Sequence, residues 1–176
     1  MKKPIGIAGF KGSGKDTLAD LMLEYDKGFK KYSMADPIRK MGKVFHFSKN
    51  EMLNPKMKEV ENKFWGMSWR KFAQLTGTDL FRHNFRDDVW IKFAEYAIEK
   101  TKKNLIIPDI RFDNEALMIK KHGGIVIKVR REGCNGDSHA SERGVDDKYV
   151  DVFVDNDGSI KAMKKKVEKI LKQYGG

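Results

Sequence analysis

The chain has 176 residues, and its 36 lysines and arginines outnumber its 25 aspartates and glutamates to give a net charge of +11. This length suits one domain with a buried core, and no apolar stretch approaches the length that crosses a bilayer. Residues 1–4 lead directly into an apolar run, which leaves no room for a signal peptide. Cys134 is the only cysteine and the four histidines lack metal-ligand spacing, so we expect neither disulfides nor zinc. A cytoplasmic protein with no membrane partner is expected.

The excess of positive charge favours anionic partners, either nucleic acid or the phosphates of small nucleotides. Part of this excess lies in residues 160–174, where apolar residues recur at helical spacing among lysines. The pattern predicts a C-terminal helix whose lysines face water. We therefore expect small-molecule nucleotides as partners and no specific nucleic acid.

A glycine-rich segment, Gly-Phe-Lys-Gly-Ser-Gly-Lys at residues 9–15, follows the first apolar run, and Leu18, Leu21 and Met22 follow it at helical spacing. Strand, glycine loop and helix in this order indicate a phosphate-binding loop. Glycines let backbone N–H groups face phosphate oxygens, and the helix N-terminus adds partial positive charge. The residues expected to bind nucleotide phosphates are Lys11, Gly12, Ser13, Gly14 and Lys15.

The position after the loop lysine departs from the usual motif. A serine or threonine usually ligates magnesium there, whereas this chain has Asp16 followed by Thr17. A carboxylate is also a hard oxygen ligand, so Asp16 is expected to contact Mg²⁺ either directly or through a water. Thr17 is a second candidate at the metal and a donor to an inner phosphate.

The next segment contains a predicted strand over residues 29–33 and a helix with Pro37 in its first turn. Arg39 lies in the first turns of that helix, just beyond a strand end, where α/β sheets bind ligands. It is either a surface arginine or a residue that holds a substrate phosphate. The polar residues 48–63 contain a turn or a helix start at Asn54.

Ser68 is predicted to cap a helix in which Trp69, Phe72 and Leu75 face inward and which ends at Gly77. Polar side chains gather around this expected helix break, where they are placed to contact a base edge and a phosphate. They are Gln74, Thr78 and Arg82.

A second amphipathic helix is predicted to end near Lys100, and its Trp90 is either a core residue or a ligand of the base. Residues 104–109 then form a buried type of strand that ends in Asp109, in the layout of a Walker B aspartate. An acid at this strand tip orients magnesium or its waters, or acts on a substrate hydroxyl.

The remaining elements are a helix over residues 114–121, strands over residues 125–129 and 150–154, and the C-terminal helix. Alternating strands and helices predict an α/β fold with a central parallel sheet.

Basic residues follow two of the later strand ends. Arg111 lies just beyond the Walker B-like strand, and Arg130 and Arg131 follow the strand over residues 125–129. The segment after these two arginines is polar and irregular, which is typical of a lid or a binding loop. We expect residues 130–148 to form a lid that closes over the phosphates.

Five segments together resemble the phage-type deoxynucleoside monophosphate kinases, a family of P-loop nucleotide kinases. They are the loop at residues 9–17, Ser33-x-Ala35-Asp36-Pro37-x-Arg39, Gln74-x-x-Gly77-Thr78-x-x-x-Arg82, Pro108-Asp109-x-Arg111-Phe112-x-Asn114-Glu115 and His139-x-Ser141-Glu142. The loop indicates nucleotide phosphates in general, and the third and fourth segments narrow the resemblance to this family. It extends from the first strand to Asn156 and includes the aspartate after the loop lysine.

The resemblance implies a P-loop NTPase fold, a three-layer sandwich in one domain over residues 1–176. It also implies a helical insertion over residues 34–100 that binds the nucleoside monophosphate, and a short lid over residues 130–148. The reaction implied is transfer of the ATP γ-phosphate, with Mg²⁺, to a deoxynucleoside 5′-monophosphate. Such enzymes are often dimers, so a homodimer is one expected state, and a phage-encoded member works in the host cytoplasm.

Roles follow from the resemblance and from the need for positioning and charge neutralisation in phosphoryl transfer. The nucleotide contacts are the loop residues 11–17 and Asn156, and the metal contacts are Asp16, Thr17 and Asp109. The catalytic charges are Lys15, Arg111, Arg130 and Arg131. The acceptor contacts are Arg39, Arg70, Gln74, Thr78, Arg82, Trp90 and Asp109.

Two other functions are compatible with parts of this pattern. A P-loop kinase for another phosphorylated metabolite, such as phosphomevalonate, needs the loop and the arginines but not the segment from Gln74 to Arg82. A P-loop protein that binds nucleic acid uses the net charge of +11 and binds with a steep salt dependence. The chain contains no recognisable nucleic-acid-binding module.

Overall fold

The computed structural model describes residues 3–134 and 144–174. The chain divides into two compact units. The first, which we call the sheet unit, consists of Met1–Ser33 and Ala94–Gly176, and the second, the helical unit, consists of Met34–Phe93. The helical insertion expected at residues 34–100 overlaps the helical unit, and its last seven residues belong to the sheet unit.

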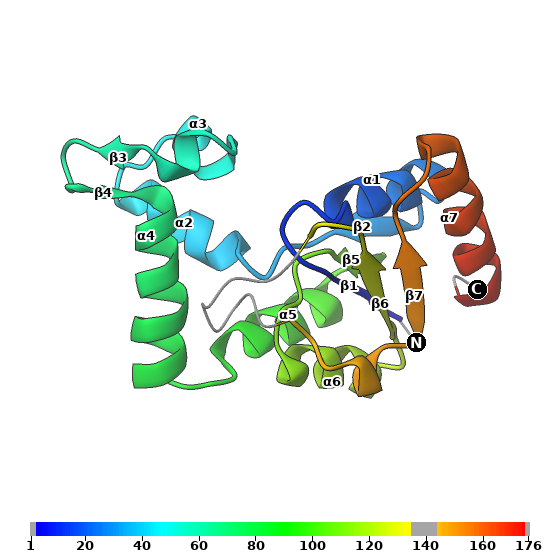
Figure 1. Cartoon of the computed structure of the whole chain (residues 1–176). Coiled ribbons are helices and arrows are strands. Elements are labelled where there is room, and N and C mark those ends of the chain that lie inside the picture. The colour runs from blue at the N-terminus through cyan, green and yellow to red at the C-terminus, as the bar shows by residue number, and fades with distance from the viewer. Residues whose placement is uncertain (1–2, 135–143, 175–176) are drawn as a thin grey trace. The chain divides into compact units, whose positions relative to one another are not determined.

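Five parallel strands form the central sheet of the sheet unit (Figure 1). Their order is β2-β5-β1-β6-β7, and their bounds are Ile5–Ala8 (β1), Phe29–Lys31 (β2), Asn104–Ile107 (β5), Ile125–Arg130 (β6) and Val152–Asp155 (β7). The central strand β1 is buried along its whole length, as expected of a parallel strand covered on both faces. The parallel central sheet predicted from the sequence is confirmed.

Helices cover both faces of this sheet. On one face α1 (Lys15–Tyr25) and α7 (Ile160–Tyr174) pack beside each other. On the other face α6 (Asp113–Lys121) packs against β1 and β6, and the last residues of α5 (Val89–Lys100) also belong to the sheet unit. The result is the predicted three-layer α/β sandwich.

The apolar residues of the sheet and its helices form a continuous core. Its members on α1, α7 and the strands include Ile7, Leu18, Met22, Ile127 and Val167, each at most 1% exposed. Successive residues of a strand face opposite sides of the sheet. A continuous run of β-branched residues in a strand therefore packs against the helices on both faces. Among the described residues, no helix combines the length and the apolar character needed to span a bilayer.

The helical unit contains short helices and a two-stranded hairpin. Its elements are α2 (Asp36–Val44), α3 (Lys49–Leu53), the 3₁₀ turn η1 (Met57–Glu59), β3 (Glu61–Asn62), β4 (Met67–Ser68), α4 (Trp69–Gln74), the π-helical segment η2 (Leu75–His83) and the start of α5. The predicted cap at Ser68 is confirmed, because its side chain accepts a hydrogen bond from the Lys71 N–H. A second serine, Ser48, caps α3 in a capping box with Glu51, and this short helix was not predicted.

Two sequence predictions about this unit are wrong. The helix after Ser68 does not end at Gly77 but continues as a π-helical segment to His83. Gly77 packs closely against α2, because a Cβ at this position would lie 2.8 Å from Cδ1 of Ile38 and would require that side chain to shift. Leu75 does not face inward, since it is 44% exposed, whereas Trp69 and Phe72 are buried as predicted.

An aromatic cluster holds α2, α3 and α4 together. The rings of Phe47, Trp69 and Phe72 lie with centroids 5.0 to 5.6 Å apart, a spacing at which aromatic pairs attract one another. Gly42 on α2 lies against this cluster, and a Cβ there would come within 2.3 Å of Cζ3 of Trp69. The glycine therefore allows the helix to approach the tryptophan closely.

We predict that Gly42→Ala destabilises the protein. In an open helix alanine would be more stable than glycine by up to about 1 kcal/mol, but overpacking a filled core costs about 1–3 kcal/mol. Urea unfolding should show a lower midpoint for this variant. The matched control is Gly158→Ala, whose new Cβ meets its nearest neighbour, Cβ of Ala162, at an ordinary 3.5 Å and should change stability little. A Gly42→Ala variant as stable as the parent chain would contradict this account.

Candidate functional site

The turn from β1 into α1 has the backbone of a phosphate-binding loop. Gly9, Gly12 and Gly14 have φ angles of 144°, 83° and 98°, a region that residues with a side chain rarely adopt. A Cβ on Gly9 would also lie 2.6 Å from the carbonyl oxygen of Val129 on β6. The helix begins directly at Lys15, so its unpaired N–H groups and partial positive charge lie at the loop. This arrangement suits anionic phosphate.

A cavity of about 400 Å³ opens in front of this loop, within the sheet unit. Its lining combines loop glycines, the first turn of α1, one arginine from the end of β6 and the segment after β7. The lining residues are Gly12, Gly14, Lys15, Asp16, Thr17, Arg131, Asn156, Gly158 and Ile160. The sequence prediction that these loop residues form one site with Arg131 and Asn156 thus agrees with the position of the cavity.

Asn156, which directly follows β7, connects the phosphate-binding loop to the end of this strand. Its side-chain amide donates a hydrogen bond to the Ser13 carbonyl at 2.9 Å, and its backbone N–H donates to the Arg130 carbonyl at 2.7 Å. The same amide nitrogen lies only 2.3 Å from where a Cβ on Gly14 would be. Asn156 therefore sets the shape of the loop as well as lining the cavity.

The adjacent arginines Arg130 and Arg131 are placed differently, because successive residues at a strand end face opposite sides. Arg131 lines the cavity, and its guanidinium lies 3.5 Å from the Gly12 carbonyl oxygen. Arg130 extends along β7, where it pairs with Asp155 at 3.2 Å and stacks over the Phe153 ring at 4.0 Å. The two arginines are therefore not equivalent in position, whereas the sequence prediction gave both the same role.

Lys15 and Asp16 begin α1 at the edge of the cavity. The Lys15 ammonium donates to the Phe10 carbonyl at 3.0 Å and so lies over its own loop. The exposed Asp16 carboxylate pairs with Lys31, at the end of β2, at 3.1 Å, and Lys31 also pairs with Asp20 at 3.0 Å. Partial burial disfavours charge on Lys31, but hydrogen bonds and attraction from Asp20 and Asp16 outweigh it and raise the pKa of Lys31.

Asp109 lies just beyond β5, the strand next to β1, and is partly buried. One of its carboxylate oxygens accepts a hydrogen bond from the Ser33 hydroxyl at 2.5 Å. Because β2, β5 and β1 are neighbours in a parallel sheet, the loops after all three strands leave the same edge. Asp109 is therefore on the edge of the sheet from which the phosphate loop extends.

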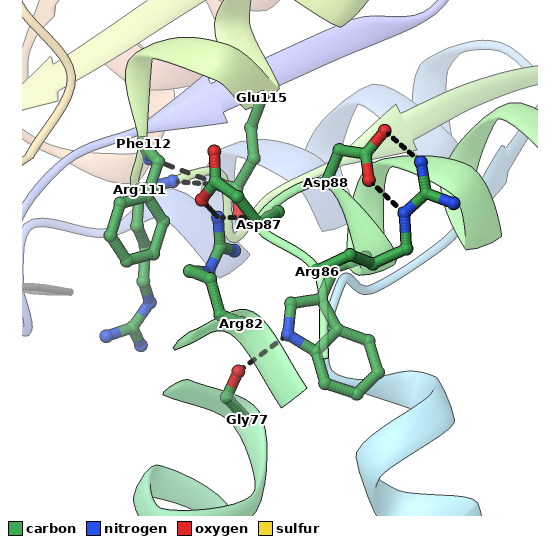
Figure 2. A network of polar contacts seen from close by, with 9 residues as sticks. Gly77, Arg82, Arg86, Asp87, Asp88, Arg111, Phe112 and Glu115 are labelled. Atoms are coloured by element: carbon green, nitrogen blue, oxygen red, sulfur yellow. Dashed lines mark hydrogen bonds and ion pairs between the residues drawn. The ribbon is translucent and has the colours of Figure 1, made fainter. Parts of the chain in front are cut away.

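The turn that carries Arg111 is held by a buried carboxylate (Figure 2). Glu115 is 2% exposed, and its Oε2 accepts hydrogen bonds from the backbone N–H groups of Arg111 at 2.7 Å and Phe112 at 3.2 Å. Glu115 is the third residue of α6, so these bonds satisfy donors at the start of that helix. The direction of the backbone at Arg111 is thereby fixed.

In the helical unit, three predicted arginines have nearby acidic partners. Arg39 pairs with Asp36 at 2.8 Å on α2, and Arg70 pairs with Glu59 at 2.5 Å. Arg82 is 6% exposed and donates to the Asp87 carbonyl at 3.4 Å. A nearly buried guanidinium has few alternative rotamers, so Arg82 is held in one position.

The other predicted contacts of the helical unit lie on or beside the π-helical segment. Gln74 is partly exposed at the end of α4, and Thr78 is buried within η2. Trp90 is 4% exposed, its indole N–H donates to the Gly77 carbonyl at 2.7 Å, and its ring packs on Phe81 and Phe93. Trp90 is therefore packed as a core residue, which is one of its two sequence interpretations, and its role as a substrate contact stays a prediction.

The described residues offer few protein ligands for a divalent metal ion. The described residues contain no group of three or more His, Cys, Asp or Glu side chains that could hold a metal ion. Magnesium usually binds through one or two carboxylates together with substrate phosphates. The donors present, namely Asp16 and Thr17 at the cavity and Asp109 on the same edge of the sheet, fit that mode and do not fit a dedicated metal cage.

Three residues that hold the site together had no role predicted from the sequence. Lys31, Ser33 and Glu115 contact Asp16, Asp109 and the turn at Arg111, respectively. A positional signal existed for the first two, because both lie at the carboxyl end of β2. Of the lid expected at residues 130–148, residues 135–143 lie outside the described residues, as do His139, Ser141 and Glu142 of the resemblance.

The parallel sheet, the glycine loop before α1 and the cationic cavity define the chain as a P-loop protein that binds nucleotide phosphates. A solved structure of a Chloroflexus aurantiacus protein provisionally assigned as a kinase has this fold, with a TM-score of 0.50 and 12% identity over 99% of each chain.

The chain belongs to the deoxynucleotide monophosphate kinase family, whose model matches residues 40–167. It is 34% identical over 158 residues to a protein of Acanthamoeba polyphaga mimivirus provisionally named deoxynucleotide monophosphate kinase, covering 78% of this chain and 79% of that one. It is also 34% identical over 110 residues to the deoxynucleotide monophosphate kinase of Enterobacteria phage T4, covering 60% of this chain and 46% of the phage protein. The chain is therefore a phosphotransferase for nucleoside monophosphates, and the family predicted from its motifs is confirmed.

We predict that Asn156→Ala weakens nucleotide binding. A net hydrogen bond contributes about 1 kcal/mol, so loss of the bond to the Ser13 carbonyl should raise the Kd of a non-hydrolysable ATP analogue about fivefold. Asn156→Asp should bind still more weakly, because a carboxylate cannot donate and repels phosphate. Asn84→Ala is the matched control, since Asn84 makes the same kind of bond to the Asp79 carbonyl at 2.6 Å in the helical unit. Equal affinity for all four proteins would show that Asn156 does not shape the loop.

Proposed function

We propose that the chain transfers the γ-phosphoryl group of ATP to a deoxynucleoside 5′-monophosphate, in the presence of Mg²⁺, and forms ADP and the diphosphate. The observation that carries this proposal is the cavity in which Lys15, Arg131 and the N-terminus of α1 converge on a glycine loop. Family membership supplies the substrate class. We also propose that the enzyme works in the cytoplasm of its cell or phage host, with a homodimer as the assembly to be tested by sedimentation.

The loop and the first turn of α1 are assigned to the donor nucleotide. Backbone N–H groups of the loop bind phosphate oxygens, the Ser13 N–H only after it leaves the Phe10 carbonyl, to which it donates at 3.1 Å. Lys15 likewise moves from the Phe10 carbonyl to the outer phosphates as a mobile point charge. Asn156 keeps the loop in shape through the Ser13 carbonyl. These contacts bind the donor without discriminating among bases.

Asp16, Thr17 and Asp109 are assigned to Mg²⁺. Bound Mg²⁺ would supply neutralisation of charge on the donor phosphates. The Asp16 carboxylate is exposed and pairs with Lys31 at 3.1 Å. In this assignment it either leaves Lys31 to bind the metal or contacts Lys31 and the metal at the same time. Asp109 is more firmly held, because it is partly buried and bonded to Ser33.

The acceptor nucleotide is assigned to the helical unit. We assign Arg39 and Arg82 to its phosphate, with Arg70 as a further cation, and Gln74 and Thr78 to the base. The support is local, because these residues lie on α2, on α4 and on the π-helical segment η2, and π-helical insertions are frequent at functional sites. Trp90 supports that segment through the Gly77 carbonyl and is not assigned to the base.

The chemical step needs charge neutralisation more than proton transfer. An acceptor phosphate oxygen forms a bond to the γ-phosphorus while the bond from that phosphorus to the β–γ bridging oxygen breaks, and ADP leaves with this oxygen. The attacking oxygen is already anionic, so no strong general base is required. Lys15, Arg111 and Arg131 neutralise the charge that spreads over the transferring group.

We predict that the two neighbouring arginines differ in their effect on turnover. Removing one preorganised donor to the transition state typically costs 10²–10³ in kcat, so Arg131→Ala should lose on the order of a hundredfold or more. Arg130→Ala should lose far less, because Arg130 is engaged with Asp155 and Phe153 on β7. Steady-state kinetics of both variants at saturating ATP provide the measurement. Equal losses in the two variants would refute the assignment of Arg131 alone.

The substrate class is tested by turnover of each common dNMP and NMP with ATP and magnesium, followed as ADP release. We predict activity with deoxynucleoside monophosphates, none with phosphomevalonate, and a loss of at least a hundredfold for Lys15→Met, which keeps the bulk of the side chain without its charge. Absence of turnover with every nucleotide would overturn the proposal. Tight binding to DNA or RNA that weakens steeply between two salt concentrations would instead favour the nucleic-acid alternative.

A further inference from the structure

We propose that Ser33 is a positioning residue for the metal-binding carboxylate Asp109, and this inference rests on the proposed function for the role of Asp109. The Ser33 hydroxyl donates a hydrogen bond to Oδ2 of Asp109 at 2.5 Å, across 76 residues of sequence. Ser33 is 8% exposed, so water has little access from its side. Neither Ser33 nor this contact has a role in binding or chemistry in the assignment given above.

The contact is a consequence of how the sheet is built. β2 pairs with β5 in parallel, with Phe29 opposite Asn104 and Lys31 opposite Ile106, and the pairing continues through a bond from the Tyr32 N–H to the Ile106 carbonyl at 2.9 Å. Both strands therefore reach the same edge in register. Ser33 and Asp109 lie just beyond their respective strands, where backbone geometry is still set by the ladder.

The β5 side of this pair is rigid. Ile106 and Ile107 are fully buried, and β5 lies between β2 and β1, so its end is fixed from both sides. The aspartate side chain, by contrast, can rotate about two bonds unless a partner holds it. The Ser33 hydroxyl, just beyond the neighbouring strand β2, is one partner that restrains this rotation.

A hydroxyl bonded to a carboxylate affects how that carboxylate binds a metal. It fixes the plane of the carboxylate, so the oxygens already face one direction when a metal arrives. Removing a partner that orients a metal ligand in this way typically lowers metal affinity 10- to 100-fold. Ser33 should therefore act on metal affinity and leave the phosphate loop unchanged.

The test separates metal-dependent from metal-independent nucleotide binding. Titration calorimetry measures the Kd of a non-hydrolysable ATP analogue with Mg²⁺ and again with EDTA, and the ratio of the two values reports the coupling between metal and nucleotide. In Ser33→Ala we expect this coupling to fall about tenfold or more, with the Kd in EDTA unchanged within about twofold. Ser33→Thr, which retains a hydroxyl, should restore most of the coupling.

Two further variants make the outcome decisive. Ser48→Ala removes a serine hydroxyl in the helical unit, one that accepts a hydrogen bond from the Glu51 N–H at the cap of α3, and should leave the coupling at the parent value. If Ser33→Ala does not fold, Ser33→Cys offers a weaker donor of similar size, and the proposal then requires a loss of coupling in that variant. Unchanged coupling in a folded Ser33 variant that lacks the hydroxyl overturns the proposal.

Asp109→Asn shows which inference has failed in that event. If Asp109→Asn loses coupling while the Ser33 variants keep it, Asp109 binds metal and only the positioning role of Ser33 is wrong. If Asp109→Asn also keeps coupling, the metal assignment under the proposed function is wrong, and the role of Ser33 falls with it. Loss of coupling in both, with rescue by Ser33→Thr, supports the proposal.

Discussion

The tight turn between β1 and α1 is the constraint on which the rest of the site depends. To direct its N–H groups outward, the backbone adopts positive φ at Gly9, Gly12 and Gly14, and these glycines contribute no side-chain packing of their own. The turn must therefore be held from outside. Asn156 bonds to the Ser13 carbonyl, and the Val129 carbonyl oxygen lies 2.6 Å from where a Cβ on Gly9 would be. The order of the sheet, with β1 between β5 and β6, makes this support possible because each neighbouring strand ends beside the loop.

The lysines and arginines that produce the net charge of +11 include two kinds, those paired with acidic side chains and those that line the cavity. Many cations are neutralised locally, as with Arg130 by Asp155 and Arg70 by Glu59. Exposed pairs of this kind contribute little to stability, typically below about 1 kcal/mol, so their main effect is to hold side chains in place. The cations that converge on the cavity, Lys15 and Arg131, instead contact backbone carbonyls of the loop. A carbonyl is a weaker partner than a carboxylate, so these carbonyl contacts are readily exchanged for contacts with phosphate.

Most of the sheet unit could be predicted from the sequence because its signals are local: buried apolar runs, a glycine loop and helical periodicity. The helical unit was less predictable. Gly77 was interpreted as a helix end, whereas its missing side chain makes room for Ile38, and sequence alone does not distinguish a glycine that ends a helix from one that permits packing. Contacts such as Ser33 with Asp109 depend on β2 lying next to β5. Strand order is a property of the whole chain, so no local pattern reports such a pair.

The departure at Asp16 gains a physical explanation from its neighbour. A carboxylate at the first turn of α1 interacts favourably with the helix dipole, but it also lies beside a loop that binds anionic phosphate. Two anions at one site repel each other unless a cation lies between or beside them. Lys31, partly buried at the end of β2, occupies that position at 3.1 Å from Asp16. The usual hydroxyl needs no such partner, so an aspartate after the loop lysine requires a cation nearby. Lys31 lies there because β2, which packs against α1, ends beside Asp16.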